Sequence, residues 1–402
     1  MKKLLYKTNN YLLLVLLATI FFLQQGCKKD ESSSAAPVIT GVRNYVASPG
    51  DSLLTSVGPG KWVIISGRNL KGALEVYFDG VRASSLNAAL FSDTSAMVLM
   101  PSVIAFPLVE ASKLNTIRYV TTHGETTFSF PIVAPAPTIS GISNEGANPG
   151  DSVKINGFNF FFIKSVKYAG VDVTSYKASD DGTSISLAVP SGISTSGGVV
   201  SVSTKSGTVT TVYNVHDYVT GVLNNYDGVN NFSWGAATSN SSVDFPGNNG
   251  TYGVLQASNL AAGNRNWWER SFNLNSAQWI PANKLQDTLG NYALKFEIFV
   301  KKPWVNGSIQ IVKDYSWTYT ALYRPWKNSD GSTSPFTTKG WQTVTIPLSD
   351  FVTDTGVPVS SIKDLVGPTG AGGTMIAFIN DGSTVVADFE AAVDNIRVVK
   401  IK

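Results

Sequence analysis

Short runs in which apolar and polar residues alternate dominate the chain beyond about residue 36. One example places Leu74, Val76 and Phe78 between more polar neighbours and ends at Gly80. Such runs, bounded by Gly, Pro or Asn, are typical of β-strands, because successive side chains of a strand point to opposite faces. No long segment has apolar residues spaced three and four apart, as an amphipathic helix requires. The pattern therefore predicts an all-β protein.

Four short motifs occur twice, in the same order, in the first half of the chain. The pairs are APVITGV and APTISGI (36–42 and 136–142), SPGDS and NPGDS (48–52 and 148–152), ISGRNL and INGFNF (65–70 and 155–160), and VYFDGV and VKYAGV (76–81 and 166–171). Each copy spans about 80–100 residues, which suits an immunoglobulin-like sandwich. The motifs resemble those of IPT/TIG domains. The resemblance implies two tandem sandwiches, at 37–134 and 137–215. We interpret them as spacers, with ligand binding by one copy as the alternative.

The N-terminal region has the features of an export signal. Lys2 and Lys3 precede an apolar run at 11–23, which is shorter than the roughly 20 residues that a membrane-spanning helix needs. The lone cysteine, Cys27, follows Gly26, and this pair resembles the end of a bacterial lipoprotein signal. The resemblance implies a signal at 1–26, lipidation of Cys27 and a tether at 27–36. The KKDE tract after Cys27 resembles the export signal of Bacteroidetes surface lipoproteins, which implies an outer-membrane location that faces the exterior.

Composition argues against several classes of function. The formal net charge is only +3 and no long basic run occurs, so we expect no nucleic-acid partner. A single cysteine excludes disulfides and multi-cysteine metal sites. The two histidines, His123 and His216, lie in different predicted domains and offer little for a catalytic triad or a zinc site. We expect no cofactor. The closing carboxylates could hold a structural calcium ion, but solvated positions are the preferred interpretation; they are Asp388, Glu390 and Asp394.

Glycosidase chemistry needs two positioned carboxylates, one of them with a raised pKa. The carboxylates considered beyond residue 216 form no recognisable motif; they are Glu269, Glu297, Asp314, Asp388, Glu390 and Asp394. We therefore expect no catalytic residue and no enzyme activity.

Eight of the nine tryptophans lie beyond residue 216, more than a core of that size requires. Indole rings in polar surroundings favour a recognition surface, and such rings stack on the apolar face of a sugar. The predicted glycan-binding residues in polar or loop-rich segments are Trp234, Trp267, Trp268 and Trp326, with Trp317 and Trp304 as weaker candidates. The segment YSWTY (315–319) could equally present a buried face. Trp279 and Trp341 are predicted to be core residues.

The segments GWQTVTIPLSDF (340–351) and VDNIRVV (393–399) resemble the last strands of β-jelly-roll carbohydrate-binding modules. The order of lipoprotein signal, two IPT-like repeats and tryptophan-rich domain resembles the SusE-like or SGBP-B group of Bacteroidetes surface glycan-binding proteins. The resemblance implies a jelly-roll or sandwich domain at 216–402 that captures xyloglucan or another β-glucan for a polysaccharide utilization system. It also implies a SusC/SusD-like transporter complex as a candidate partner.

Two other classes of function remain open. The chain could be an adhesin or structural surface protein that binds through its immunoglobulin-like repeats, or, as a weaker alternative, an enzyme that acts on glycosides. The location of binding, in the repeats or in the C-terminal domain, distinguishes the adhesin from the glycan-capture protein.

Overall fold

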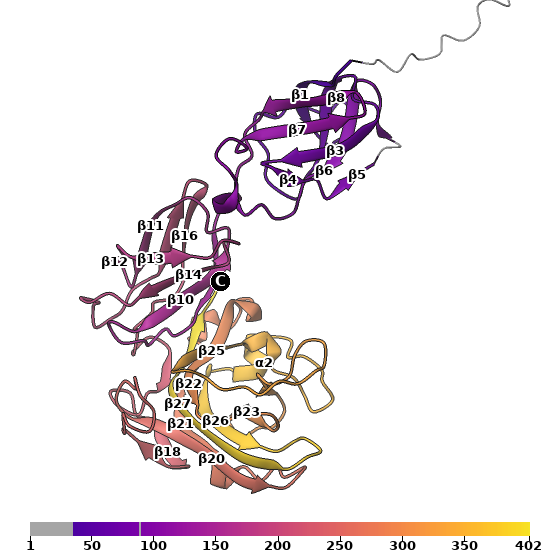
Figure 1. The fold of residues 1–402 in the computed structure, drawn as a ribbon. Helices are drawn as coiled ribbons and strands as arrows, with labels where there is room; N and C mark the ends of the chain where they lie inside the picture. Colours follow the sequence, from indigo (N-terminus) through magenta and orange to yellow (C-terminus); the bar gives the residue numbers. More distant parts are fainter. Residues whose placement is uncertain (1–34, 88–89) are drawn as a thin grey trace, which may run out of the picture. The chain divides into compact units, whose positions relative to one another are not determined.

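The computed structural model describes residues 35–87 and 90–402, so Cys27 and the predicted signal lie outside the described residues. The chain divides into two compact units, one ending at Ala134 and the other comprising Pro135–Lys402 (Figure 1). Strands dominate both, which confirms the predicted all-β class. Over the described ranges, no helix is both long and apolar enough to span a bilayer.

The first unit is a sandwich of two four-stranded sheets, which we call the first sandwich (residues 35–134). Its sheets have the strand orders β1-β2-β6-β5 and β4-β3-β7-β8. The strands are β1 (Val38–Asn44), β2 (Trp62–Arg68), β3 (Ala73–Phe78), β4 (Val81–Arg82), β5 (Ser85–Leu86), β6 (Ser95–Leu99), β7 (Thr116–Thr121) and β8 (Gly124–Ser129), with the 3-10 helix η2 (Phe106–Leu108) between β6 and β7.

The second unit begins with a sandwich of the same topology, the second sandwich (residues 135–215). Its sheets have the orders β13-β14-β10-β9 and β12-β11-β15-β16. The strands are β9 (Thr138–Ile142), β10 (Ser152–Phe158), β11 (Ile163–Tyr168), β12 (Val171–Asp172), β13 (Tyr176–Ala178), β14 (Ser184–Ala188), β15 (Ser201–Thr204) and β16 (Gly207–Thr210). Each strand has a counterpart at the same place in the first sandwich, as the repeated motifs predict.

A tight hairpin recurs at the same point of both copies. In the first sandwich Phe78 pairs with Val81, so Asp79 and Gly80 alone form the turn. Their φ angles are 51° and 77°, and positive φ at both central residues is the requirement of a type I′ turn. Ala169 and Gly170 repeat this turn in the second copy, with φ angles of 50° and 80°. The repeated G-V, in which the glycine ends the turn and the valine begins the next strand, therefore marks a hairpin.

Two larger sheets follow in the C-terminal domain (residues 216–402). One has the order β19-β20-β27-β22-β25, with β17 added beside β27, and the other has the order β18-β21-β26-β23-β24. The strands are β17 (Val222–Asn224), β18 (Phe232–Gly235), β19 (Thr238–Ser239), β20 (Tyr252–Leu260), β21 (Ser271–Gln278), β22 (Tyr292–Val300), β23 (Ser308–Lys313), β24 (Thr320–Tyr323), β25 (Gln342–Pro347), β26 (Ala371–Ile379) and β27 (Val386–Lys400). The short helices are η3 (Trp268–Arg270), η4 (Ala282–Lys284), η5 (Leu289–Asn291), η6 (Leu348–Asp350) and α2 (Ile362–Val366).

The core of this domain lies between its two sheets, which stack face to face (Figure 1). Alternation explains the packing: Phe272 and Leu274 of β21 face Phe296 and Ile298 of β22 across one hydrophobic cluster. Strand β22 is buried almost throughout, because on its other face Lys295 contacts the second sandwich and Phe299 packs against Phe245 and Trp341. The second sandwich and the C-terminal domain therefore contact each other at the outer surface of this sheet.

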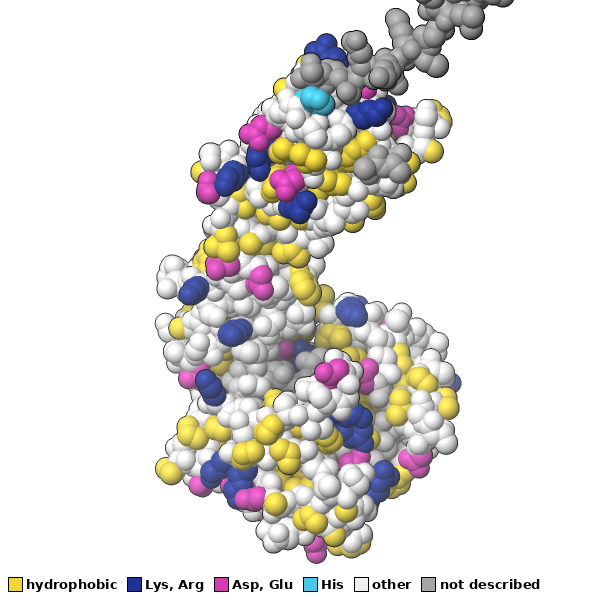
Figure 2. All heavy atoms as spheres, turned by 45° about the vertical axis from the view of Figure 1, so that its right-hand side comes forward, with side chains coloured by type: hydrophobic (Ala, Val, Ile, Leu, Met, Phe, Trp, Pro, Cys, Tyr) yellow, Lys and Arg dark blue, Asp and Glu magenta, His cyan; other side chains and the backbone are white. Residues whose placement is uncertain are grey.

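Charges on the surface are mixed rather than segregated. Figure 2 shows Lys and Arg side chains interspersed with Asp and Glu side chains over the face in view. This distribution agrees with the small net charge of the chain and offers no single basic path for a polyanion on that face.

Candidate functional site

The five-stranded sheet of the C-terminal domain exposes one face, which we call the outer face. The strand register places Trp234 of β18 beside Asn273 of β21, then Met375 of β26, Val312 of β23 and Thr320 of β24. Alternation puts these side chains opposite to the core. A row that runs across all five strands therefore carries an indole ring at one edge.

Trp267 lies over the middle of this row. It comes from the segment between β20 and β21, and it packs with Tyr315 on the small apolar cluster of Val312, Met375 and Ala377. These three apolar side chains form the surface on which the rings of Trp267 and Tyr315 pack. The rings are consequently held above the sheet by packing rather than left on free loops.

Four aromatic rings surround Trp267, and we call these four rings together with Trp267 the aromatic cluster. The centroid of the Trp267 ring lies 5.9 Å from that of Trp234, 5.9 Å from Trp317, 6.1 Å from Trp268 and 6.2 Å from Tyr315. These separations are typical of interacting aromatic pairs. Contacts between the rings therefore fix their positions and still leave part of the cluster exposed to solvent.

Three rings of the cluster are open to solvent. Trp268 is 50% exposed, Trp234 45% and Trp317 36%, whereas Trp267 is half-buried between them. Indole rings are rarely left this exposed in a group, because their apolar area is large. The exposure agrees with the predicted loop position of Trp267 and Trp268.

The segment that carries Tyr315 and Trp317 has an unusual backbone. Asp314, Tyr315 and Trp317 all have positive φ, at 52°, 53° and 57°. Non-glycine residues rarely adopt this conformation, and groups of them tend to occur at functional sites. The segment is a loop, and of its three aromatic residues Tyr319 alone packs against the core, so the buried face left open from the sequence applies only to Tyr319.

Asp314 anchors that loop to strand β26. Its backbone N–H donates to the carbonyl of Gly373 at 2.9 Å, and its Oδ1 accepts from the Gly373 N–H at 2.5 Å. Lys313 forms an ion pair with the same carboxylate. A side chain at Gly372 would place its Cβ 2.2 Å from Asp314 Oδ1, so only glycine leaves room for the anchor.

The segment that carries Trp267 and Trp268 is fixed by a buried arginine. The Arg270 guanidinium donates to the carbonyl of Asn266 and lies 3.4 Å from a carboxylate oxygen of Glu269. The Asn264 carbonyl accepts from the Asn380 N–H at 2.9 Å, which ties the other end of the segment to β26. The backbone carbonyls of Asn264 and Asn266, which accept from Asn380 and Arg270, thus fix the turn that presents both rings.

Two of the tryptophans predicted from the sequence do not belong to the outer face. Trp304 is 1% exposed and packs among core rings, and its Nε1 donates to the carbonyl of Asn306 at 2.8 Å. Trp326 is half-buried against the same core, with its Nε1 on the carbonyl of Gly307 at 2.8 Å. The exposure expected for Trp326 was wrong, because its loop folds back over the core.

The structure confirms the prediction that two other tryptophans are structural. Trp279 is 1% exposed and donates to the Thr374 hydroxyl at 2.9 Å. Trp341 is buried with Phe245 and Tyr252 in a separate cluster. Tyr315, in contrast, was missed as a site residue, and the only sequence signal for it was its place in the aromatic segment 315–319.

The carboxylates considered for catalysis occupy structural positions. Asp388 and Glu390 pair with Lys302, and Glu390 also pairs with Lys301. Burial raises the pKa of Asp394 to about 9, but this carboxyl is only 2% exposed. Asp394 cannot act on a polymer from that position. Across the residues that the structure describes, no group of three or more His, Cys, Asp or Glu side chains could hold a metal ion.

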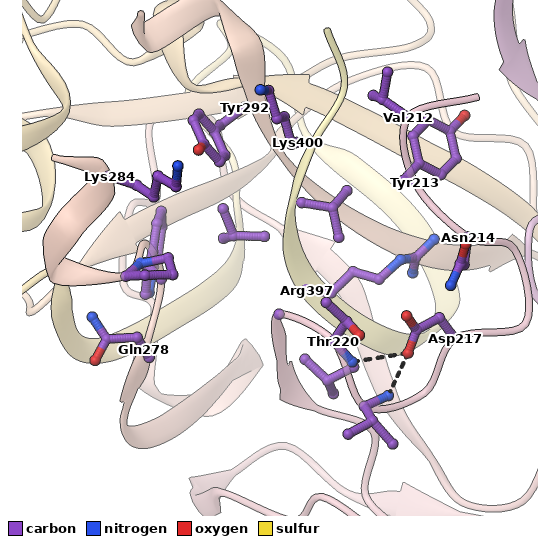
Figure 3. Close-up of a pocket in the computed structure, with 17 residues that line it drawn as sticks. Val212, Tyr213, Asn214, Asp217, Thr220, Gln278, Lys284, Tyr292, Arg397 and Lys400 are labelled. Carbon is purple, nitrogen blue, oxygen red and sulfur yellow. Dashed lines mark hydrogen bonds between the residues drawn. The ribbon is translucent and has the colours of Figure 1, made fainter. Parts of the chain in front are cut away.

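A hollow of about 560 Å³ lies where the second sandwich joins the C-terminal domain. Figure 3 shows Lys284 and Gln278 on one side of strand β27 and Val212 and Tyr213 on the other. None of its three aromatic residues offers a free face, because Lys295 Nζ lies 3.6 Å from the centroid of the Tyr213 ring and both Trp279 and Tyr292 are buried. The hollow is thus less suited to stacking than the outer face.

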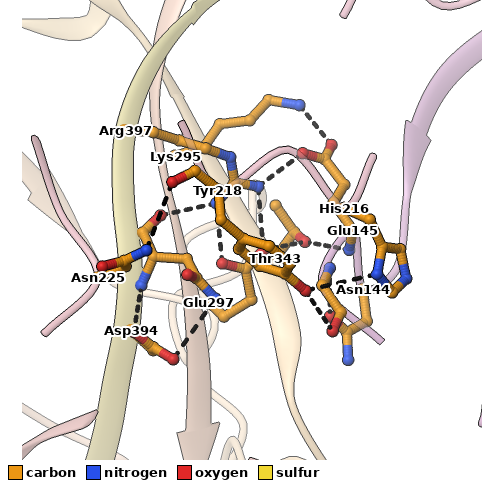
Figure 4. Close-up of polar contacts among 12 residues, drawn as sticks. Asn144, Glu145, His216, Tyr218, Asn225, Lys295, Glu297, Thr343, Asp394 and Arg397 are labelled. Atoms are coloured by element: carbon orange, nitrogen blue, oxygen red, sulfur yellow. Dashed lines mark hydrogen bonds and ion pairs between the residues drawn. The ribbon is translucent and has the colours of Figure 1, made fainter. Parts of the chain in front are cut away.

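Beside this hollow lies a buried cluster of four charged side chains (Figure 4). Glu145 of the second sandwich accepts from Lys295 at 2.5 Å and from Arg397 at 2.7 Å. Arg397 also contacts Glu297 at 2.8 and 2.9 Å. Burial opposes ionisation of Glu145, but Arg397 and Lys295 outweigh it and hold the pKa of this carboxyl below its ordinary value. The cluster is a contact between the second sandwich and the C-terminal domain.

Comparisons with known proteins point to one group. Residues 215–400 match the family model described as the surface glycan-binding protein B xyloglucan binding domain. A curated relative from Bacteroides ovatus, an IPT/TIG domain-containing protein, is 27% identical over 177 residues, which cover 40% of this chain and 36% of the relative. The match thus spans about a third of that relative's own length.

Two solved structures have the same fold along most of the chain. Surface glycan-binding protein PbSGBP-B from Prevotella bryantii has a TM-score of 0.67 at 22% identity, over 91% of this chain and 99% of that one. SGBP-B from a complex xyloglucan utilization locus in Bacteroides uniformis has a TM-score of 0.52 at 20% identity, over 91% and 99%. These findings confirm the predicted resemblance: the chain resembles the type B surface glycan-binding proteins, and its C-terminal domain matches the model of their xyloglucan binding domain.

Proposed function

We propose that this chain is a non-catalytic surface protein that captures a β-glucan-type polysaccharide on its outer face. The observation that carries the proposal is the aromatic cluster, in which four rings contact Trp267 and three of the five are at least a third exposed. Aromatic anchors seated on a rigid sheet lose little freedom on binding, so their apolar area is available for affinity.

The chemistry of the cluster suits a sugar polymer. A pyranose ring presents C–H groups on one face and hydroxyl groups around its edge, so it needs an aromatic surface flanked by polar groups. Trp234 and Trp317 supply free ring faces on either side of Trp267. The polar segment 264–266 directly precedes Trp267 in the chain. The match to a xyloglucan-binding family model supports a β-linked glucan as the ligand.

A glycan array with the full chain tests this proposal. We expect signals for xyloglucan or related β-glucans, and calorimetric titration should then place the binding in residues 135–402. Binding by the first sandwich alone would favour the adhesin alternative. That sandwich is a separate compact unit, so it can be tested by itself.

We also propose that the chain has no glycosidase activity. The cluster is bordered by Asp314 and Glu269, which are paired with Lys313 and Arg270 rather than set as an acid and a nucleophile. Incubation with a glycan that binds should release no reducing ends. Release that depends on either carboxylate would contradict the proposal.

The proposed location is the outer membrane, with the acyl chains on Cys27 and the sandwiches as spacers. The support is the apolar run before Gly26-Cys27 and the surface location in the names of the similar proteins. Cys27→Ala should move the chain from the membrane fraction to the soluble fraction. A SusC/SusD-like transporter complex is the proposed receiver of the captured glycan, and co-purification from solubilised membranes would test it.

A further inference from the structure

The outer face carries a group of polar side chains at some distance from the aromatic cluster, and we call this group the polar end. Ser308 begins strand β23, Arg324 follows β24, and Asp381 follows β26. Arg324 Nε donates to the Ser308 hydroxyl at 2.6 Å, and the Ser308 hydroxyl donates to Asp381 Oδ1 at 2.7 Å. The Arg324 guanidinium also forms an ion pair with Asp381. The guanidinium is thus held by two partners.

All three residues lie on the same face as the aromatic cluster. Ser308 shares the parity of Val312 along β23 and lies four residues from it. Asp381 and Arg324 lie just beyond the ends of β26 and β24, and both are hydrogen-bonded to the Ser308 hydroxyl on this face. At a rise of about 3.3 Å per residue, the polar end lies about 13 Å from the row of the aromatic cluster. Only a glycan of several sugar rings can reach both ends.

Gln310 stands between the two ends. It pairs with Ala377 on one side and Leu322 on the other, in the row next to the aromatic one. Its side chain is only 8% exposed and its amide makes no hydrogen bond in the part of the chain that the structure describes, but neither amide atom is fully cut off from solvent. The amide is therefore free to exchange hydrogen bonds with water for hydrogen bonds with a ligand. A polar ligand group can bind in this row without displacing a protein partner.

The charges at the polar end suit a neutral, hydroxylated ligand. Asp381 is 4% exposed and neutralises Arg324, whose side chain is 32% exposed. Nη1 of Arg324 has no partner among the described residues, so its two N–H groups are free to donate. Fixed N–H groups bind hydroxyl oxygens well, because the guanidinium loses little freedom when the bond forms.

We propose that Gln310 and Arg324 form a polar subsite that hydrogen-bonds hydroxyl groups of the same glycan beyond the aromatic cluster. This inference rests on the proposed function of the cluster. Under this proposal, the aromatic rings bind short ligands, and the polar end adds affinity only for ligands long enough to reach it. Arg324 acts directly on the ligand, whereas Asp381 and Ser308 position it.

Calorimetric titration with ligands of increasing length tests the subsite. The probes are cello-oligosaccharides from disaccharide to hexasaccharide and the corresponding xyloglucan oligosaccharides. The variants are Gln310→Ala and Arg324→Lys. The lysine keeps the positive charge beside Asp381 but lacks the planar set of N–H donors of the guanidinium. We expect both variants to match the wild type on the shortest ligand that the wild-type chain binds. We expect both to bind the longest ligand about tenfold more weakly, as the loss of one hydrogen bond to the ligand predicts.

Arg118→Lys is the matched control, because Arg118 forms an exposed pair with Glu125 in the first sandwich. It should leave every titration unchanged. Equal losses for short and long ligands in the Gln310 and Arg324 variants would mean a structural role and would overturn the inference, as would wild-type affinity for the longest ligand in both. Failure of the wild-type chain to bind any probe would instead reject the proposed function and the subsite with it.

Discussion

An indole ring in the C-terminal domain stabilises the fold or is free to contact a ligand according to the face of the sheet on which it lies. Trp304 fills the space between the two sheets and contacts Phe378 and Phe389 at centroid distances of 5.9 and 5.0 Å. Trp234 and Trp268 lie on the outer face with about half of their surface exposed. Residues of one type therefore have separable roles, which substitution can distinguish.

Alanine substitutions should divide the tryptophans into two groups. Trp234→Ala or Trp268→Ala should weaken glycan binding by about 30-fold or more, because aromatic anchors are often worth about 2 kcal/mol or more, and should leave the melting temperature nearly unchanged. Trp304→Ala should lower the free energy of unfolding by about 3–5 kcal/mol through the cavity that it leaves. Calorimetric titration and thermal unfolding of each variant separate the two effects. Early unfolding of Trp234→Ala and Trp268→Ala would show that these rings are structural.

A buried carboxyl in the first sandwich should make that unit less stable as the pH rises. Asp79 is 1% exposed, and burial raises its pKa to about 6 from the ordinary 3.8. The folded state therefore holds a proton that the unfolded state has lost. Its stabilising effect is complete below about pH 4 and disappears as the pH rises through about 6.

Asp79→Asn should remove this dependence. Asparagine also suits the positive φ at the start of the Asp79-Gly80 turn, and its oxygen can still accept from the Thr116 N–H. We expect a gain of about 1–2 kcal/mol in the unfolding free energy of the first sandwich at pH 7.5 and little change at pH 4. Denaturant unfolding at the two pH values measures both. Equal effects at both values would show that the carboxyl stays ionised in the folded state.

At the scale of elements, the loop between β23 and β24 depends on a glycine in a neighbouring strand. Gly372 leaves the space that the Asp314 carboxylate occupies. Gly372→Ala should displace the loop and move Tyr315 and Trp317 away from Trp267. Because supporting residues set the geometry of a site, we expect glycan binding about tenfold weaker.

Gly290→Ala serves as the control for this change, because a Cβ at Gly290 meets nothing within 4 Å. Tryptophan fluorescence of the two variants should differ, since only the first disturbs the ring contacts. Unaltered affinity in Gly372→Ala would show that the position of the loop does not matter for binding.

The strands and the loop between β23 and β24 differ in how far the sequence predicts them. Alternation identifies strands and the repeated motifs identify two sandwiches of one topology, because both depend on residues close together in the chain. The face that an indole ring takes depends on long-range packing, so Trp304 and Trp326 were misplaced. The left-handed turn at Asp314 and Tyr315 is set by contacts with β26, about 60 residues further along, and has no local signal.

At the scale of the molecule, the second sandwich is more than a spacer, because its Glu145 completes a charge cluster inside the second unit. Lys295 and Arg397 come from the C-terminal domain and are almost fully buried, as is Glu145. With Glu297, the four side chains balance in charge. The sandwich and the domain that carries the aromatic cluster thus form one structural unit.

Removal of Glu145 tests this coupling. Glu145→Ala leaves two buried cations facing one carboxylate, and breaking a buried pair in this way costs about 3–5 kcal/mol. Denaturant unfolding of residues 135–402 should show that loss, and the second sandwich and C-terminal domain should then unfold in separate transitions. Glu125→Ala, which removes the partner of Arg118 from an exposed pair, should cost the first sandwich at most about 1 kcal/mol. A single transition of wild-type stability in Glu145→Ala would mean that apolar packing alone joins the two domains.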